Sequence, residues 1–267
     1  MNPSITSAEA VTTSWQFGLI ALSYLIAVIG SLGALTAAKR IRGRDGFSLL
    51  NTLSAGTALG GIGVWAMHFT GMAALRMDMA VGYSMIETLV SLVAAIAAAS
   101  VALAYVAYRP ESVHRLIVAG PLLGMGVVVM HYLGMYGMRF PGAVIWSMPI
   151  VGLSILIAVV AATAALWLAF RTHALSLRVV AAMVMGVAVC AMHYTGMAAA
   201  DYVCTSPADR FNNPQGWGVI NSSTLPGMTA IVALGLAVLI LVDQLFQGIM
   251  SRQSPGQRPA ARPTRGL

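Results

Sequence analysis

The hexapeptide Met67-His68-Phe69-Thr70-Gly71-Met72 occurs three times in this sequence. It returns as Met130-His131-Tyr132-Leu133-Gly134-Met135 and as Met192-His193-Tyr194-Thr195-Gly196-Met197. The three histidines are 63 and 62 residues apart, which is the period of a repeated structural unit and too regular for a local coincidence. The repeat therefore decides which fold we expect for the rest of the chain.

The similarity between the copies continues upstream of the hexapeptide. A glycine stands seven residues before each histidine and a valine four residues before it; they are Gly61, Gly124 and Gly186, and Val64, Val127 and Val189. On a helix that turns by about 100° per residue, these residues share one face with the histidine and with the glycine and methionine that follow it. Because glycine lets helices approach closely in a membrane, we expect this face to lie between helices.

The composition is typical of an integral membrane protein. Hydrophobic residues make up 58% of the chain and charged residues 9%, and the mean hydropathy is +0.82. Seven apolar stretches reach the about 20 residues that a membrane-spanning helix needs. They are residues 15–37, 49–72, 84–108, 114–136, 147–170, 177–200 and 226–247. The sequence thus predicts an all-α fold, a polytopic membrane bundle of seven transmembrane helices.

The starts of these stretches indicate how the repeat is built. Tyr83-Ser84-Met85 and Trp146-Ser147-Met148 begin the third and fifth stretches and are again 63 residues apart, while Met228 is a looser counterpart near the start of the seventh. We therefore predict a unit of two helices that is used three times, together with one additional helix.

Basic residues cluster in alternate loops, most densely at Lys39-Arg40-Ile41-Arg42-Gly43-Arg44. The formal net charge of +7 therefore reflects cations on the cytoplasmic side rather than a nucleic-acid surface. This bias predicts a multi-pass protein of the bacterial inner (cytoplasmic) membrane, with its N-terminus outside and its C-terminus in the cytoplasm. We expect an external segment at 1–14, a membrane domain at 15–247 and a disordered basic tail at 248–267. The long outer loop 201–225 is expected to cover or gate a site.

The histidine face carries ligands that suit a soft metal ion. Neutral imidazole binds copper, zinc, iron and nickel, and the thioether of methionine favours Cu(I). Copper is therefore the predicted metal, ahead of zinc, whose usual ligands are cysteine, histidine and carboxylates. The candidate ligands are His68, His131 and His193, the methionines four residues later (Met72, Met135 and Met197), and those just before (Met67, Met130 and Met192). The alternative is that these side chains only hydrogen-bond and pack inside the bundle.

Other residues admit two interpretations. Cys190, three residues before the third histidine, could be a ligand or a small buried hydrophobe, and together with Cys204 it predicts no disulfide framework. Tyr132 and Tyr194 fit an interfacial aromatic belt or a redox role. Glu87, in the outer half of a span, could accept a proton or a cation, or could be held in a structural hydrogen bond.

Three hexapeptides of the form Met-His-Tyr/Phe-Thr/Leu-Gly-Met on alternate spans resemble those of the bacterial MHYT-domain integral membrane sensors, over about residues 15–247. The resemblance implies a domain that binds copper through the motif histidines and methionines near the outer face and senses a diatomic gas such as oxygen, carbon monoxide or nitric oxide. The middle copy departs from the family pattern by having Leu133 in place of threonine.

Many members of this family continue into domains that make or hydrolyse cyclic di-GMP, or into a histidine kinase. Here only a short basic tail follows the last predicted span. We therefore expect no catalytic domain, so that the protein would not be an enzyme and would signal through a separate cytoplasmic partner.

Two other classes of function stay open. A copper or proton transporter would use Glu87 and the methionines as successive sites, although such a pathway needs sites over the full membrane depth and here they concentrate at the outer end. A b-type haem protein would use two of the motif histidines as axial ligands.

Overall fold

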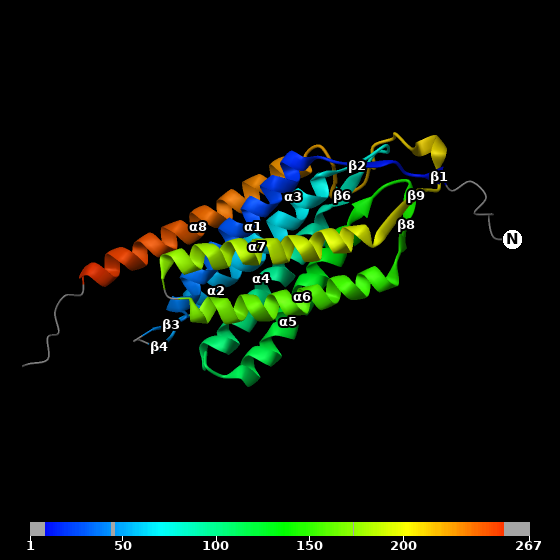
Figure 1. The fold of residues 1–267 in the computed structure, drawn as a ribbon. Coiled ribbons are helices and arrows are strands. Elements are labelled where there is room, and N and C mark those ends of the chain that lie inside the picture. The colour runs from blue at the N-terminus through cyan, green and yellow to red at the C-terminus, as the bar shows by residue number, and fades with distance from the viewer. Residues whose placement is uncertain (1–8, 44–45, 173, 254–267) are drawn as a thin grey trace, which may run out of the picture.

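The computed structural model describes residues 9–43, 46–172 and 174–253, which form a bundle of long helices with short strands at its ends (Figure 1). The helices are α1 (Phe17–Ala37), α2 (Leu49–Gly56), α3 (Met67–Ala73), α4 (Met85–Ala107), α5 (Val113–Tyr136), α6 (Met148–Arg171), α7 (Leu175–Ala198) and α8 (Leu225–Gln253). Short 3-10 helices, η1 (Ala38–Arg40) and η3 (Pro207–Asp209), and a π-helix, η2 (Thr57–Ala66), complete the helical segments of the described residues.

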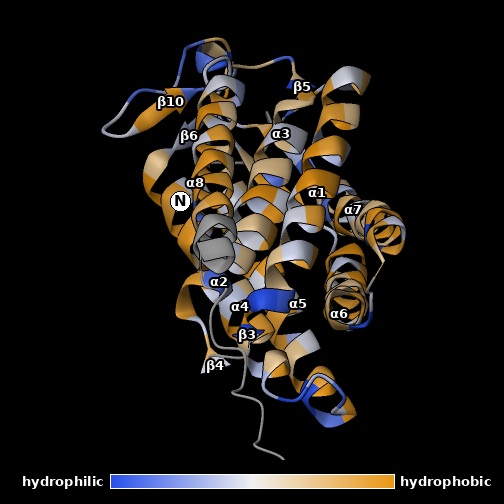
Figure 2. Cartoon of the chain, turned by 90° about the vertical axis from the view of Figure 1, so that its left-hand side faces the viewer, coloured by the Kyte–Doolittle hydropathy of each residue, from blue (hydrophilic) through white to orange (hydrophobic). Residues whose placement is uncertain are grey.

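The prediction of a mainly helical fold with several helices of membrane length is confirmed. Within the described residues, six helices are long and apolar enough to cross a membrane: Phe17–Arg40, Met85–Ala107, Val113–Tyr136, Met148–Arg171, Leu175–Ala198 and Leu225–Asp243. Figure 2 shows hydrophobic residues along these helices and hydrophilic residues mainly near their ends. α8 continues to Gln253, past the predicted end of the last span at 247, and residues 254–267 of the predicted tail lie outside the described residues.

The predicted second span, 49–72, is helical throughout but is not one regular helix. It consists of α2, the π-helix η2 and α3 in direct succession. A π-helix places one more residue in a turn than an α-helix does, and such turns are frequent at functional sites. Because η2 divides the segment into two short α-helices, it is not one of the six continuous helices of membrane length.

The π-helix accommodates one additional residue in the first copy of the repeat. Gly60 fits against the backbone of Ala95 on α4, as Gly124 fits against the backbone of Ala158 on α6. Gly60, however, precedes its histidine by eight residues and Gly124 by seven. A Cβ atom at Gly61 would meet Leu236 of α8 and Ile96 of α4, so in its packing against the backbone of the next helix Gly60, rather than Gly61, corresponds to Gly124.

The helices of the repeat form a closed ring, and α8 lies outside it. Around the ring, α1 is followed by α7, α6, α5, α4 and the α2–η2–α3 segment, which returns to α1. The three helices that carry the hexapeptide thus alternate with α1, α4 and α6. α8, at the edge of the bundle in Figure 1, packs against η2 and α3 from outside. The ring therefore has approximate threefold symmetry, with three pairs of helices.

The third partner helix of the repeat is α1 rather than α8. We call α1, α4 and α6, which alternate with the motif helices in the ring, the partner helices. In three matching backbone hydrogen bonds, the residue before a partner helix donates its N–H to a carbonyl just after a motif helix. These bonds run from Gln16 to Ala74 (2.9 Å), from Ser84 to Gly137 (2.8 Å) and from Ser147 to Ala199 (2.8 Å). Met228, the predicted third counterpart, lies on α8 outside the ring, so the additional helix is the last one.

Short strands cover the end of the ring at which the hexapeptides end, and we call them the cap. They are β1 (Glu9–Ala10), β2 (Thr13–Trp15), β5 (Leu75–Met77), β6 (Gly82–Ser84), β7 (Met138–Arg139), β8 (Gly142–Trp146), β9 (Ala200–Cys204) and β10 (Val219–Asn221). The antiparallel pairs β2–β5, β6–β7 and β8–β9 repeat the threefold arrangement, with β1 added to β9 and β10 to β6. At the opposite end, β3 (Arg42–Gly43) pairs with β4 (Gly46–Phe47).

The long loop 201–225 belongs to the cap, since it contains most of β9 and all of η3 and β10. The guanidinium group of Arg210 fastens it to the rest of the cap through ion pairs with Glu9 (2.8 Å) and Asp78 (2.5 Å). The inner side of the cap is apolar, and its Tyr83, Tyr202 and Cys204 belong to the same buried cluster as motif residues such as Met72. The loop thus covers the motif, as its length suggested.

Candidate metal centre

The three motif histidines meet inside the ring. His68 comes from α3, His131 from α5 and His193 from α7, and no more than 1% of any of these residues is exposed. Their Nδ1 atoms form a triangle with sides of 3.1 Å between His68 and His131, 3.1 Å between His68 and His193, and 3.3 Å between His131 and His193. The repeat therefore brings its three imidazoles together at one centre.

Aromatic rings fix the orientation of the imidazoles. Each imidazole meets the ring of the following residue edge-on, with centroid distances of 4.7, 4.8 and 4.7 Å for Phe69, Tyr132 and Tyr194. These rings in turn meet an aromatic residue just before the partner helix; the pairs are Phe69–Tyr83, Tyr132–Trp146 and Tyr194–Trp15. Because such edge-to-face contacts stabilise a defined geometry, the imidazoles are held with their planes 72° to 90° apart.

The triangle cannot satisfy its own hydrogen bonds. A ring nitrogen of histidine either carries a proton and donates, or lacks it and accepts. Among three nitrogens that all contact one another, at least two are of the same kind, so at least one side joins two donors or two acceptors. The Nε2 atoms on the other side of the rings are not satisfied either, because all three are buried without a hydrogen-bond partner. Burying polar atoms in this state costs stability, which indicates that the centre is built for a further group.

A metal ion fits the centre of the triangle. The point equidistant from the three Nδ1 atoms lies about 1.8 Å from each, close to the about 2.0–2.1 Å of a metal–imidazole bond. The Nδ1 atoms of His68, His131 and His193 would hold such an ion together, each by its lone pair. Among the described histidines, cysteines and acidic residues, these three form the group that could hold a metal ion.

The six candidate methionines are all buried, but their surroundings differ. Met192 lines an internal cavity with Val64, whereas Met72 lines a pocket beneath the cap and Met135 lines a groove beside Tyr132. The remaining three, Met67, Met130 and Met197, are equally buried. Burial suits a ligand and a packing residue alike, so their role as ligands stays a prediction.

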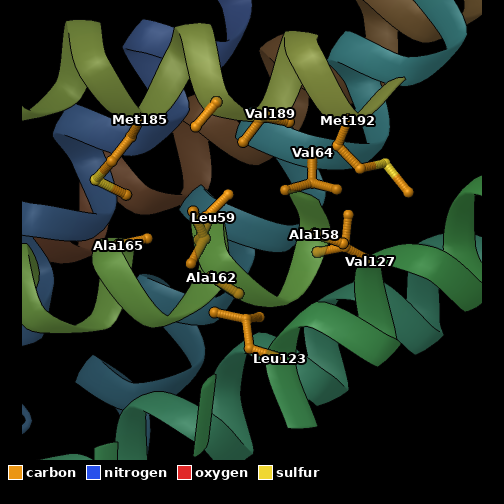
Figure 3. A pocket seen from close by; sticks show the side chains of 12 residues that line it. Leu59, Val64, Leu123, Val127, Ala158, Ala162, Ala165, Met185, Val189 and Met192 are labelled. Carbon is orange, nitrogen blue, oxygen red and sulfur yellow. The ribbon is translucent and has the colours of Figure 1, made fainter. Parts of the chain in front are cut away.

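An apolar cavity lies on the side of the histidine triangle away from the cap. Its lining includes Val64, Val127 and Val189, the residues four positions before each histidine, and small side chains of α6 such as Ala158 and Ala162 (Figure 3). A separation of four helical residues corresponds to about 6 Å, so the valines stand one turn below the imidazoles. The cavity measures about 30 Å³ and its lining is almost wholly apolar.

The other polar candidates lie apart from the triangle. The carboxylate of Glu87 accepts hydrogen bonds from the hydroxyl of Ser84 and, at 2.5 Å, from the guanidinium of Arg139. In the structure this carboxylate thus forms a local ion pair at the start of α4. Cys190 is half-buried on α7 and Cys204 is buried in β9, and both thiols are free. The expectation that these cysteines form no disulfide is consistent with their free thiols.

Two sets of residues around the site escaped the analysis of the sequence. The first is a serine on each partner helix that contacts the motif helix: Ser23, Ser91 and Ser154. Each stands eight residues after an aromatic residue, Trp15, Tyr83 or Trp146, and this spacing is a signal that the sequence contains. The second concerns the glycine inside each hexapeptide: the sequence places it on an interhelical face, but its contact with the histidine of another copy becomes apparent only in three dimensions.

Comparison with known proteins matches two copies of the repeat to a known family. The family model MHYT, described as "Bacterial signalling protein N terminal repeat", matches residues 61–119 and 124–182. The chain is 35% identical over 260 residues to the bifunctional diguanylate cyclase/cyclic di-GMP phosphodiesterase MucR of Pseudomonas aeruginosa, a match that covers 96% of this chain and 37% of that protein.

Two further relatives are more distant. The signaling protein YkoW of Bacillus subtilis is 30% identical over 72% of this chain and 25% of its own length. The cyclic di-GMP phosphodiesterase NbdA of Pseudomonas aeruginosa is 32% identical over 68% of this chain and 24% of its own length. The chain thus spans about a quarter to somewhat over a third of the length of these relatives. No solved structure matches it.

Proposed function

The chain belongs to the MHYT family of bacterial signalling proteins, and on this premise we propose that it is a membrane-embedded copper sensor for a diatomic gas. The observation that supports the proposal best is the buried triangle of Nδ1 atoms from His68, His131 and His193, which lacks a consistent set of hydrogen bonds without a cation. When bound there, copper would supply one-electron redox chemistry and an open position for a small ligand.

The choice of copper over zinc rests on the donors around the triangle. Imidazole binds both metals, but copper stands above zinc in the general order of affinity. Six buried methionines accompany the histidines on the same three helices, and thioethers favour Cu(I). Zinc also binds sets of histidines, but methionine is not among its usual ligands, so the six methionines are what favours copper.

The internal cavity supports a gas as the signal. Its volume of about 30 Å³ exceeds the about 10–15 Å³ that one water-sized molecule needs. Its lining favours an apolar guest over water, because water requires polar partners. Oxygen, carbon monoxide and nitric oxide are both small and nearly apolar. The cavity also lies only one helical turn from the imidazoles.

We further propose that α2–η2–α3 completes a seventh span, with the N-terminus outside and the C-terminus in the cytoplasm of a bacterial inner-membrane protein. β1 and the end of α8 lie at opposite ends of the bundle, as an odd number of spans requires (Figure 1). The signal would leave through α8, where Asp243 accepts a hydrogen bond of 2.9 Å from Ser54 of α2. Relatives named as cyclic di-GMP enzymes suggest that the receiver belongs to cyclic di-GMP signalling.

The geometry disfavours the two alternative functions. A transport pathway needs polar sites through the bundle, and toward the end away from the cap buried apolar residues such as Leu35, Leu103 and Leu166 outnumber buried polar ones such as Ser31, Asn51 and Ser100. A haem iron with two axial histidines needs the imidazoles on opposite faces of a macrocycle. The three imidazole centroids are only 4.9–5.2 Å apart, which leaves no space for a macrocycle between them.

Metal analysis and electron paramagnetic resonance of the purified protein test the proposed centre. His68→Ala, His131→Ala and His193→Ala should each remove most of the bound copper, because the three imidazoles share one ion. His114→Ala, an exposed histidine at the start of α5, is the matched control and should retain it. Loss of about one third of the metal in each variant would indicate three independent sites, and zinc or a Soret band in place of copper would refute the assignment of the metal.

Reporter fusions test the proposed topology. A reporter fused after residue 247 should behave as cytoplasmic, and one inserted near Asp209 should behave as external. The opposite result would place the histidine triangle near the inner face of the membrane.

A further inference from the structure

The glycine of each hexapeptide lies against the histidine of a different copy. A Cβ atom added at Gly134 would collide with Nε2 of His68, and one added at Gly196 would collide with Nε2 of His131. The cycle closes with Gly71, where a Cβ atom would collide with Nε2 of His193. Each motif helix therefore supplies one imidazole to the centre and one glycine that leaves space for the imidazole of another motif helix.

These contacts determine which edge of each ring faces outward. After Nε2, the next ring atom that the added Cβ would meet is Cδ2, at 2.8 Å for His193, 2.9 Å for His131 and 3.0 Å for His68. In an imidazole, Nδ1 lies across the ring from the bond between Nε2 and Cδ2. An imidazole whose Nε2–Cδ2 edge lies against a neighbouring glycine thus directs Nδ1 to the opposite side, which is where the three Nδ1 atoms meet.

We propose that Gly134, Gly196 and Gly71 are positioning residues for His68, His131 and His193, respectively, and that they make Nδ1 the metal-binding atom of each histidine. The proposal rests on the proposed metal site and names how that site is aligned. The rings are closely confined, because all three are buried and already contact one another through Nδ1. An interior of this density does not absorb an added methyl group without displacing a neighbour.

Nuclear magnetic resonance of protein labelled with ¹⁵N in its histidines can read each ring separately, before any metal is added. Gly134→Ala should shift the ring nitrogens of His68 more than those of His131, although His131 is in the same hexapeptide as Gly134. The signals of each histidine are assigned from the spectrum of its alanine variant. Gly152→Ala is the matched control, because this helical glycine of α6 has open space at its Cβ position. Equal shifts of all three histidines, or a shift confined to His131, would overturn the pairing.

A thermal unfolding series keeps the proposal testable even if Gly134→Ala folds poorly. Removing the ring that suffers the collision should restore stability, so the double variant with His68→Ala should unfold at a higher temperature than Gly134→Ala alone. The double variant with His131→Ala should show no such rescue. Rescue by His131→Ala, or by neither change, would contradict the cross-copy contact.

Titration of the labelled protein with Cu(I), which is diamagnetic, identifies the binding atom. The Nδ1 signals of the three histidines should change on binding, and Gly134→Ala should weaken the affinity at least tenfold while Gly152→Ala leaves it unchanged. Binding through Nε2 would overturn the proposed orientation. If no metal binds to the unmodified protein, the proposed function fails, whereas the pairing of each glycine with its histidine is still decided by the metal-free spectra.

Discussion

The hydroxyl oxygen of Tyr194 on α7 lies 2.8 Å from the hydroxyl oxygen of Ser23 on α1. The same contact joins Tyr132 on α5 to Ser154 on α6 at 2.7 Å. In the first copy, where phenylalanine replaces the tyrosine, the partner serine of α4 accepts a hydrogen bond from the Trp65 indole instead. Each motif helix is thus bonded to its partner helix next to an imidazole.

We expect Tyr194→Phe and Ser23→Ala each to lower the free energy of unfolding by about 0.5–1.5 kcal/mol, because each removes one side of this hydrogen bond. The double variant should lose less than the sum, since either change alone already breaks the contact. Unfolding of the detergent-solubilised protein measures these values. Tyr136→Phe, which removes an exposed hydroxyl, is the control and should have no effect. Strict additivity would mean that the two hydroxyls do not stabilise each other.

The π-helix leads to a second prediction. Deletion of Gly61 would give the first copy the seven-residue spacing between glycine and histidine that the second copy has, so a regular α-helix could connect the same contacts. We expect the variant to fold and to unfold within a few degrees of the parent, since about 1 kcal/mol changes the midpoint by about 2–4 °C in a protein of this size.

Deletion of Met125 provides the matched control for this prediction. Met125 lies in the regular part of α5, and removing it rotates one half of that helix by about 100° relative to the other. Either the contacts of Gly124 or those of His131 must then be lost, and the protein should fail to assemble. If both deletions are equally damaging, the first copy does not contain a dispensable residue.

The sequence predicted the histidine centre because its signal is repeated. Three features can be read directly from the sequence: the spacing of the hexapeptides, the membrane length of the helices, and the shared face of His68, His131 and His193. The partner of the third motif, α1, was less apparent because it precedes the whole repeat, whereas α4 and α6 each follow the motif helix they pair with. The eight-residue spacing from Trp15 to Ser23 matches that from Trp146 to Ser154 and would have identified it.

Other features could not be predicted from the sequence for physical reasons. The strands of the cap have two to five residues, which is too short for an alternating pattern to emerge. The π-helix lies in an apolar, glycine-containing segment whose composition does not indicate where an extra residue is inserted, so that residue became visible only through the packing of Gly60. The contact of Gly134 with His68 joins two copies and leaves no trace in either one.

Tyr202 in the cap is the subject of the third prediction. Its hydroxyl is buried without a hydrogen-bond partner, a state that costs about 1–3 kcal/mol. Tyr202→Phe should therefore leave the stability at neutral pH unchanged or raise it. Burial also raises the pKa of Tyr202 above its usual value near 10.

The raised pKa predicts how this stability depends on pH. The unfolded tyrosine ionises near pH 10 while the folded one stays neutral, so its contribution is fully present below pH 10 and falls as the pH rises further. Thermal unfolding measured from pH 8 to pH 11 should show a smaller alkaline loss for Tyr202→Phe than for the parent. Tyr136→Phe should behave as the parent, and an equal loss in all three proteins would contradict the burial of this phenol.

The cavity below the triangle gives the fourth prediction. Ala158→Leu should fill part of the space beside Val64 and Val127, since Ala158 lines the cavity with them (Figure 3). We expect binding of carbon monoxide to the reduced, copper-loaded protein to weaken at least tenfold, while the copper affinity stays within about threefold. Infrared spectroscopy of bound carbon monoxide measures the effect. Ala164→Leu, on the exposed face of the same helix, is the control, and equal effects of both changes would exclude the cavity as a gas site.

The last prediction separates ligand methionines from packing methionines. Met72, Met135 and Met197 each follow a histidine by one helical turn, and their replacement by leucine keeps the volume and apolarity at a usual cost of under about 1.5 kcal/mol each. If they bind the metal, the triple variant should lose at least tenfold in Cu(I) affinity and much less in Cu(II) affinity. Its reduction potential should then fall by about 59 mV for each factor of ten between the two losses.

A second triple variant controls for the number of substitutions. Met125, Met148 and Met183 lie on exposed faces of α5, α6 and α7, and replacing them with leucine should change neither affinity nor potential. The histidine variants provide the opposite comparison, because imidazole binds both oxidation states and its loss should weaken both. If the first triple variant binds Cu(I) as tightly as the parent, the three methionines are packing residues. The preference for copper would then have to rest on the histidine triangle alone, which zinc could occupy equally well.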